Sequence, residues 1–248
     1  MAYRSRTNPH HDALERWQTA AARGAGAFVL VLMAGLAFLL ADAVAPPQHL
    51  PWKPLRLGDP IGVATRPKVS QAELLACRRV LQEGGVTFQA VPDSDQDAIC
   101  PVRDALFING GAAQLRPTGA VMTCDQALAY ALWDRQVVQP AAMEMFGAKV
   151  VAIDHYGSYA CRRRYGRTDT PVSEHAYANA LDIAAFRLAD GRVISVEDDW
   201  STPGLKSLYL HRVRDGACRV FATTLSPDYN QAHWNHLHLD MGRWKSCN

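Results

Sequence analysis

The sequence predicts an α+β domain, built from a small antiparallel sheet flanked by helices, behind one N-terminal transmembrane helix. Three observations lead to this prediction. An uncharged apolar run lies close to the N-terminus, at residues 24–41. Beyond residue 70, short strand-like apolar runs are interspersed with longer segments whose apolar residues recur at helical spacing. The most informative polar motifs fall on or beside the strand runs, so we expect helices to pack around the sheet that carries them.

The apolar run of eighteen residues is just long enough to span a bilayer as a helix. Four arginines and two carboxylates precede it, and a positive flank stays on the cytoplasmic side. We therefore expect a cytoplasmic segment at 1–23, a transmembrane signal anchor at 24–45 in the inner membrane, and the remainder in the periplasm. The alternative is a signal peptide cleaved near Ala43–Ala45. A leading segment of more than twenty polar residues is long for a signal peptide, which favours the uncleaved, single-pass anchor.

Residues 46–69 are predicted to be a proline-rich linker. Six prolines in this stretch favour extended, semi-rigid backbone over packed structure, which would hold the following domain off the bilayer. The domain itself is expected at 70–248. It opens with Ser70 and Glu73, a capping-box pattern that leads a helix through about residue 82 and ends at Gly84–Gly85.

Further elements are predicted along the domain. Thr123 and Gln126 repeat the capping pattern ahead of a second helix that runs to about residue 135, and a third helix begins at 140–146. Apolar residues at helical spacing predict another helix at 203–216, with Gly216 as its terminator. Strands are predicted at 86–91, 148–153, 183–186 and 193–196.

The chain's charge argues against nucleic acid as a partner. The whole chain carries a formal charge of +2, and the first 23 residues already contribute +2, since four arginines there oppose two carboxylates. The exported part is therefore neutral, whereas a phosphate-binding surface normally shows a basic excess. The sequence also contains no glycine-rich phosphate loop.

A histidine motif near the C-terminus predicts a metal site. In a strand, alternate side chains share a face, so His236, His238 and Asp240 would point the same way. His175 and Asp182 lie some fifty residues upstream. Two imidazoles and one carboxylate are the ligand set of a catalytic zinc site, which keeps its fourth position open.

Chance offers a simpler explanation for part of this pattern. Nine histidines in 248 residues produce an occasional His-x-His, and a lone histidine is more often a satisfied surface or core group than a ligand. The upstream motif is more specific, because Ala176, Ala178 and Ala180 allow the backbone to pass close to its neighbours. The combination of the two motifs favours a zinc cleft lined by the antiparallel sheet.

The two motifs together resemble a zinc peptidase superfamily. It joins lysostaphin-type endopeptidases, D-alanyl-D-alanine metallopeptidases and the hedgehog signalling domain. More narrowly, the chain resembles the bacterial extensin-like C-terminal domain family over most of residues 70–247. The segments that carry the resemblance are 157–162, 175–186, 190–192, 215–221 and 227–240.

The resemblance implies a role for each motif residue. His175, Asp182 and His238 would be the zinc ligands, and His236 would line the site as a transition-state or proton-transfer group. The glutamate bases of the superfamily have no counterpart here, because Asn235 and Ala232 occupy their positions.

His233 and His236 instead give a pattern similar to the penicillin-insensitive murein endopeptidases, where histidine replaces the glutamate. An imidazole suits this work because its ordinary pKa lies near neutral pH. His233 is thus either a catalytic base or a hydrogen-bonded residue at the entry to the strand. Arg162 is the nearest equivalent of the superfamily's carboxylate-binding arginine, although two additional residues separate it from Tyr159; the alternative is a solvated basic loop.

The six cysteines all follow the apolar run, which places them in the oxidising compartment. No two form a Cys-x-x-Cys knuckle, so we expect three disulfides among the fifteen possible connectivities. Cys161 and Cys218 are the preferred pair, because both border the predicted site.

Two functions follow as expectations. The first is a membrane-anchored periplasmic zinc hydrolase that acts on peptide or amide bonds, with peptidoglycan or a wall peptide as its substrate. The second is a noncatalytic, zinc-stabilised module that binds the cell wall or a partner protein. A hydrolase needs an open metal position, a base within reach and a cleft, whereas a binding module needs none of the three.

Overall fold

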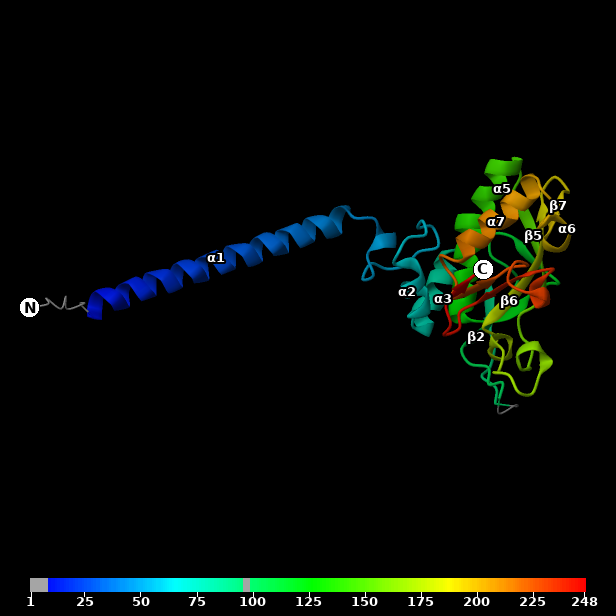
Figure 1. Cartoon of the computed structure of the whole chain (residues 1–248), viewed down its shortest axis with the longest axis horizontal. Helices are drawn as coiled ribbons and strands as arrows, with labels where there is room; N and C mark the ends of the chain where they lie inside the picture. The colour runs from blue at the N-terminus through cyan, green and yellow to red at the C-terminus, as the bar shows by residue number, and fades with distance from the viewer. Residues whose placement is uncertain (1–8, 96–98) are drawn as a thin grey trace, which may run out of the picture. The chain divides into compact units, whose positions relative to one another are not determined.

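The computed structural model describes residues 9–95 and 99–248 and divides the chain into two units, Met1–Pro46 and Pro47–Asn248 (Figure 1). The first unit holds one helix, α1 (Pro9–Val44). Its stretch Arg16–Val44 has a mean hydropathy of 2.5 and is long and apolar enough to cross a membrane. At 1.5 Å per residue, 29 residues measure about 43 Å, against about 30 Å of bilayer hydrocarbon. A membrane span or signal anchor is therefore the assignment that this helix suggests.

Residues 47–69 differ from the extended linker that their prolines predicted. They contain a short turn, η1 (Pro47–His49), and a helix, α2 (Thr65–Ser70). Leu57 is only 2 % exposed and belongs to the hydrophobic core, and Gln136 Nε2 donates to the Leu57 carbonyl at 2.7 Å. The prolines accompany only short helical turns here, with Pro67 inside α2, and they do not prevent the intervening apolar side chains from packing.

The predicted capping box at Ser70 is wrong. Ser70 ends α2, and its hydroxyl donates to the Pro67 carbonyl. The next helix, α3 (Leu74–Glu83), begins after Glu73 without a side-chain cap. Its predicted end is confirmed: Gly84 is the C-cap residue, and Gly85 adopts a φ of +77°, which glycine reaches at little steric cost.

The second unit contains two sheets. Three antiparallel strands form the smaller one in the order β1 (Phe88–Ala90), β2 (Ala105–Ile108), β4 (Ala120–Thr123). The larger sheet has seven strands in the order β10-β8-β9-β6-β5-β3, with β7 also paired to β6. Their bounds are β3 (Gln114–Arg116), β5 (Val150–Gly157), β6 (Ala180–Leu188), β7 (Val193–Ser195), β8 (Thr223–Leu225), β9 (Leu237–Asp240) and β10 (Ser246–Cys247). The predicted small antiparallel sheet is thus larger and mixed, since β3 pairs with β5 and β10 with β8 in parallel.

Helices pack around this sheet, as the α+β prediction requires. The largest run is α4 (Cys124–Trp133), a π-helical turn η2 (Asp134–Val138) and α5 (Gln139–Phe146). The predicted cap is confirmed, because Thr123 Oγ1 accepts from the Gln126 amide. Trp133 is fully buried, lies 5.9 Å from the Phe186 ring of β6 and donates to the Val213 carbonyl. The core therefore lies between α4 and the larger sheet.

The helix predicted at 203–216 is α7 (Leu205–Ala217), preceded by the short α6 (Val196–Asp199), and α5 and α7 lie in contact (Figure 1). Gly216 does not terminate it, since it lies one residue inside the helix end and Cys218 is the C-cap residue. A Cβ at Gly216 would meet Val137 Cγ1 at 2.2 Å. This glycine is required by close helix packing, not by the helix end.

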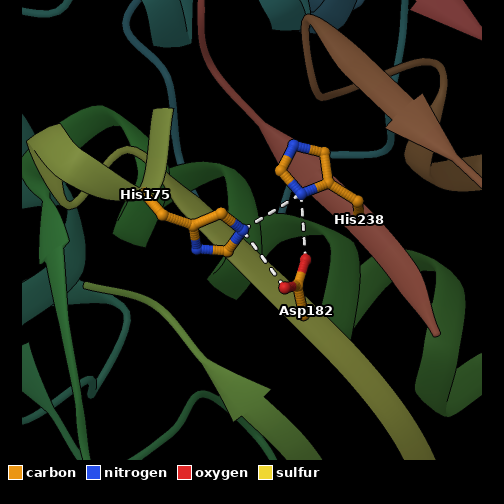
Figure 2. A group of neighbouring side chains, drawn as sticks. All are labelled: His175, Asp182 and His238. Carbon is orange, nitrogen blue, oxygen red and sulfur yellow. Dashed lines mark hydrogen bonds and ion pairs between the residues drawn. The ribbon is translucent and has the colours of Figure 1, made fainter. Parts of the chain in front are cut away.

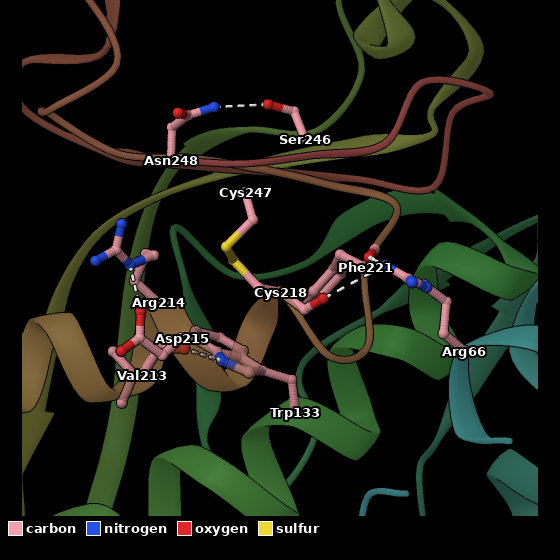
Figure 3. The surroundings of a disulfide bond; sticks show 10 residues. All are labelled: Arg66, Trp133, Val213, Arg214, Asp215, Cys218, Phe221, Ser246, Cys247 and Asn248. Carbon is pink, nitrogen blue, oxygen red and sulfur yellow. Dashed lines mark hydrogen bonds and ion pairs between the residues drawn. A yellow bond between two sulfur atoms is a disulfide. The ribbon is translucent and has the colours of Figure 1, made fainter. Parts of the chain in front are cut away.

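All six cysteines form disulfides, as predicted: Cys77–Cys124, Cys100–Cys161 and Cys218–Cys247. The preferred pair Cys161–Cys218 is wrong. Cys218 ends α7 ahead of β8, and the parallel pairing of β10 with β8 brings Cys247 to it (Figure 3). Arg66 Nη1 also donates to the Cys218 and Phe221 carbonyls, and these bonds connect α2 to the segment between α7 and β8. Three disulfides suggest that this unit matures outside the cytoplasm.

Candidate metal centre

Strands β6 and β9 bring two of the predicted ligands, Asp182 and His238, together. They pair antiparallel with Asp182 directly opposite His238, and directly opposed residues of such strands are close neighbours. Asp182 Oδ1 lies 2.9 Å from His238 Nδ1. The alternation expected from the sequence holds, because Asp240, two residues beyond His238, lines the same cleft.

His175 reaches the same point from η4 (Glu174–Tyr177), a single short turn ahead of β6. Ser173 caps the turn and Ala178 leaves it in the left-handed region, with φ of 56°. Ala176 and Ala178 are fully buried, which agrees with the close backbone passage expected there. His175 Nε2 lies 3.2 Å from Asp182 Oδ2 and 3.2 Å from His238 Nδ1 (Figure 2).

The outer hydrogen bonds of the two imidazoles fix which nitrogens face inward. His175 Nδ1 lies 2.9 Å from the Ser158 carbonyl, which only accepts, so Nδ1 is the donor. His238 Nε2 lies 2.9 Å from Asp240 Oδ2, and in a neutral ring this nitrogen donates. Each neutral ring then directs a lone pair inward, toward the other ring and toward the Asp182 carboxylate.

This donor set fits a divalent cation. The ligand atoms of His175, Asp182 and His238 all lie within 4.8 Å of one another. Two lone pairs that face each other beside a carboxylate repel unless a positive charge lies among them. A ligating histidine that donates its other N–H to a carbonyl or a carboxylate is also the usual outer arrangement of metal sites. The cluster could therefore hold a metal ion, and two nitrogens and an oxygen suit zinc.

The pKa values of the cluster express the same preference for positive charge. Burial lowers the pKa of His238, but hydrogen bonds to Asp182 and Asp240 outweigh it and raise the pKa to about 9. Burial opposes ionisation of Asp182, yet hydrogen bonds from His175 and His238 hold its pKa well below the usual range. Without a metal, a proton on His238 supplies the charge that the cluster favours.

His236 and His233 lie beside these three residues. His236 Nε2 is 3.6 Å from Asp182 Oδ1, which is too long for a hydrogen bond. The His233 ring lies 5.2 Å from the His236 ring and 5.8 Å from the His238 ring. Burial and the neighbouring histidines lower the pKa of His233 to about 4, and burial also lowers the pKa of His236. Both rings are therefore neutral at neutral pH.

A cleft of about 380 Å³ exposes the cluster to solvent. All the predicted site residues line it: Arg162, His175, Asp182, His233, His236 and His238. The Arg162 guanidinium makes no hydrogen bond or ion pair within the described part of the chain, whereas Arg163 Nη1 donates to the Thr170 carbonyl at 2.7 Å. In the basic run 162–164, Arg163 thus holds the loop together, while Arg162 and Arg164 line the cleft.

Sequence reasoning gave no role to three residues of this site. Asp240 orients His238, and its position two residues beyond His238 in the predicted strand could have indicated this role. The Ser158 carbonyl orients His175, and a backbone contact of this kind leaves no trace in the sequence. Trp244 lines the cleft because the C-terminal segment folds back to pair β10 with β8, a nonlocal event.

The fold and the site together define a disulfide-bonded α+β domain with a two-histidine, one-carboxylate cluster at the base of an open cleft. A family model described as Extensin-like protein C-terminus matches residues 75–248, and the chain belongs to this family. Neither a curated protein nor a solved structure matches the chain.

Proposed function

We propose that the protein is a zinc-dependent hydrolase of peptide or amide bonds, anchored in the inner membrane and acting on peptidoglycan in the periplasm. The observation that carries this proposal is the cluster of His175, Asp182 and His238, whose outer hydrogen bonds already direct the ligand atoms inward. The resemblance to the zinc peptidase superfamily supports the reaction class and the wall substrate. The apolar helix α1 and the three disulfides support the location.

Three residues would hold the zinc ion, and a bound zinc ion would polarise the scissile carbonyl and make water more acidic. Asp240 and the Ser158 carbonyl keep the two ligating rings in the required tautomers. The remaining steps belong to His236, His233 and Arg162, which line the cleft.

His236 is the better placed proton acceptor. Its Nδ1 lies 2.9 Å from Asn235 Oδ1, an acceptor, so Nδ1 donates and Nε2 carries the lone pair. Nε2 lies 3.6 Å from Asp182 Oδ1, on the cluster's side of the ring. A neutral imidazole in this position takes a proton from the attacking water and returns it to the leaving amine.

His233 follows the same logic with a weaker base. Asn230 Oδ1 accepts from the Ala232 amide at 2.9 Å, which identifies it as the oxygen, and it lies 2.8 Å from His233 Nδ1. His233 Nδ1 therefore donates, and Nε2 is the free acceptor. A pKa of about 4 makes this ring a poor base at neutral pH. His233 is thus both hydrogen-bonded at the strand entry and part of the cleft, and we assign it a supporting role.

A second function is favoured by one specific observation. Asn235 and Ala232 occupy the places of the superfamily's glutamate bases, so the site would serve a noncatalytic zinc-stabilised module equally well if no histidine replaces the glutamate. Such a module would bind wall polymer without cutting it.

The full-length protein in detergent, loaded with zinc and incubated with isolated peptidoglycan, separates the two functions. A hydrolase releases soluble fragments that mass spectrometry identifies, and a chelator abolishes the release. Binding of the polymer without any fragment from any wall preparation, unchanged in His236→Ala, would replace the hydrolase with the binding module.

A further inference from the structure

The metal cleft adjoins a second groove. This groove has a volume of about 550 Å³ and runs from the cleft toward Asp125 at the start of α4. Arg164, Glu174 and Trp244 line both depressions, so these three residues form their common wall. A ligand long enough to cross this wall would contact both depressions.

Several cationic side chains along this path lack an ion-pair partner. The side chains of Arg164, Arg243 and Lys245 line the groove or the cleft and make no hydrogen bond or ion pair with any residue that the structure describes. Some other surface arginines are paired, as Arg212 is with Glu144 at the surface of α7 and α5.

The carboxylates along the path are already engaged. Glu174 Oε2 accepts from Asn179 Nδ2 at 2.8 Å, and Asp125 Oδ1 accepts from the Gln126 amide at 2.9 Å. Asp182 and Asp240, in the cleft, both bond to His238. An incoming anion would thus find cations without an ion-pair partner, whereas each of these carboxylates already accepts a hydrogen bond.

Trp244 adds an apolar surface to the common wall. Its side chain is 73 % exposed, and Tyr165, 54 % exposed, also lines the cleft. A large exposed indole beside unpaired cations is typical of a binding surface, because the ring packs against an apolar face while the cations hold charged groups. The path therefore suits a chain that carries both carboxylates and apolar faces.

We infer that the second groove is an anion-binding subsite, which holds a carboxylate-bearing segment of the wall peptide while a neighbouring segment lies at the metal cluster. Arg164 and Arg243 bind the carboxylates, which planar guanidinium groups pair with in a bidentate manner, and Trp244 supports the chain between them. The inference rests on the proposed function for the identity of the polymer, but its charge preference comes from the groove alone.

A binding measurement tests the subsite without catalysis. The probe is fluorescently labelled hexaglutamate, compared with the same peptide after methylation of its side-chain carboxylates, and fluorescence anisotropy reports its binding to the full-length protein in detergent. Wild type should bind the acidic form more tightly, and Arg164→Gln and Arg243→Gln should each weaken binding by roughly two- to fivefold, the usual scale for an exposed charge pair. The preference should decrease with salt.

Two controls keep the result specific. Arg79→Gln removes one charge from the exposed face of α3, where Arg79 has no ion pair in the described structure, and should bind as wild type does. Arg243→Lys keeps the charge and should retain most of the affinity, which separates a charge effect from misfolding. Equal affinity of wild type, Arg164→Gln and Arg243→Gln for hexaglutamate would overturn the subsite.

The outcome is independent of the hydrolase proposal. If Arg164→Gln and Arg243→Gln both release wall fragments and bind hexaglutamate as wild type does, the subsite is wrong and the hydrolase proposal stands. If both variants bind hexaglutamate more weakly but wild type releases no wall fragment, the subsite stands and the hydrolase proposal is wrong.

Discussion

The cluster of His175, Asp182 and His238 and the loop that carries Arg162 and Arg164 border one cleft but are built differently. The cluster lies on paired strands and a capped turn, and its polar atoms already have partners. The loop side chains are more exposed, and a disulfide between Cys100 and Cys161 ties the loop to the segment before β2. Rigid elements thus hold the groups that must not move, while a tethered loop presents the groups that meet variable ligands.

The largest effect should come from removing a ligand of the cluster. Wild type should bind about one zinc per chain, and His238→Ala should lose it, because two remaining ligands do not hold a structural or catalytic zinc. Metal analysis of the dialysed protein measures this. His49→Ala, which removes an exposed histidine outside the cluster, should keep its zinc. Full zinc content in His238→Ala would mean that the metal lies elsewhere.

The next effect separates holding the metal from using it. His236→Ala should keep the zinc and the fold but lose about a hundredfold to ten-thousandfold in the rate of fragment release, the usual range for a general acid–base group. His233→Ala should lose less, since a ring with a pKa of about 4 is a weak base. Initial rates on isolated peptidoglycan give the comparison. A larger loss in His233→Ala than in His236→Ala would reverse the assignment of the base.

Asp240→Asn tests whether the outer hydrogen bonds matter. Asp240 Oδ2 orients His238, and loss of such a partner typically weakens metal binding by about ten- to a hundredfold. The amide keeps the size of the side chain but loses its charge. Competition titration against a zinc chelator measures the affinity. Unchanged affinity would show that Asp240 serves the fold through its bond to the Gly242 amide instead.

The raised pKa of His238 predicts how zinc affinity depends on pH. Zinc must displace the proton from this ring, so the apparent affinity should rise by about tenfold per pH unit up to a pH of about 9. In the metal-free protein the folded-state pKa lies above the ordinary 6.5, so the stability that His238 contributes is complete below pH 6.5 and lost as pH rises through about 9. Zinc-buffered titrations between about pH 6 and 8 measure the first slope. A flat affinity across that window would contradict it.

The contrast between local and nonlocal contacts explains which features could be predicted from the sequence. The shared face of His238 and Asp240 was predictable because strand alternation is local, and the cap at Thr123 was predictable for the same reason. The pairing of Cys218 with Cys247 was not, because it depends on where β10 joins the sheet. The capping box at Ser70 failed because a short helix before it ends at that residue.

Glycine and proline patterns were ambiguous for a physical reason. Gly85 and Gly216 were both predicted to end a helix. Gly85 adopts a positive φ, whereas Gly216 makes room for Val137. The prolines at 46–67 predicted an extended backbone but not the burial of Leu57 among them. In each case the local pattern limits the backbone, and the neighbour that decides its role comes from a distant part of the chain.

The smallest effect concerns the loop and compares two adjacent arginines. Arg162 faces the cleft without a partner in the described structure, and Arg163 is bonded to the Thr170 carbonyl. If Arg162 binds a substrate carboxylate, Arg162→Gln should raise KM for wall fragments several-fold with little change in kcat, because it removes binding that is equal in the ground state and the transition state. An exposed pair is typically worth up to about 1 kcal/mol. Zinc content and thermal unfolding should not change.

Arg163→Gln is the matched variant, since it removes the same charge from the next position. It should leave KM unchanged while lowering the stability of the loop, which limited proteolysis of the folded protein reports. The opposite pattern, in which Arg163→Gln raises KM and Arg162→Gln does not, would mean that loop conformation sets substrate affinity and that the exposed guanidinium is only a solvated charge. The cluster and the loop would then differ only in rigidity, and the loop would have no role of its own in substrate recognition.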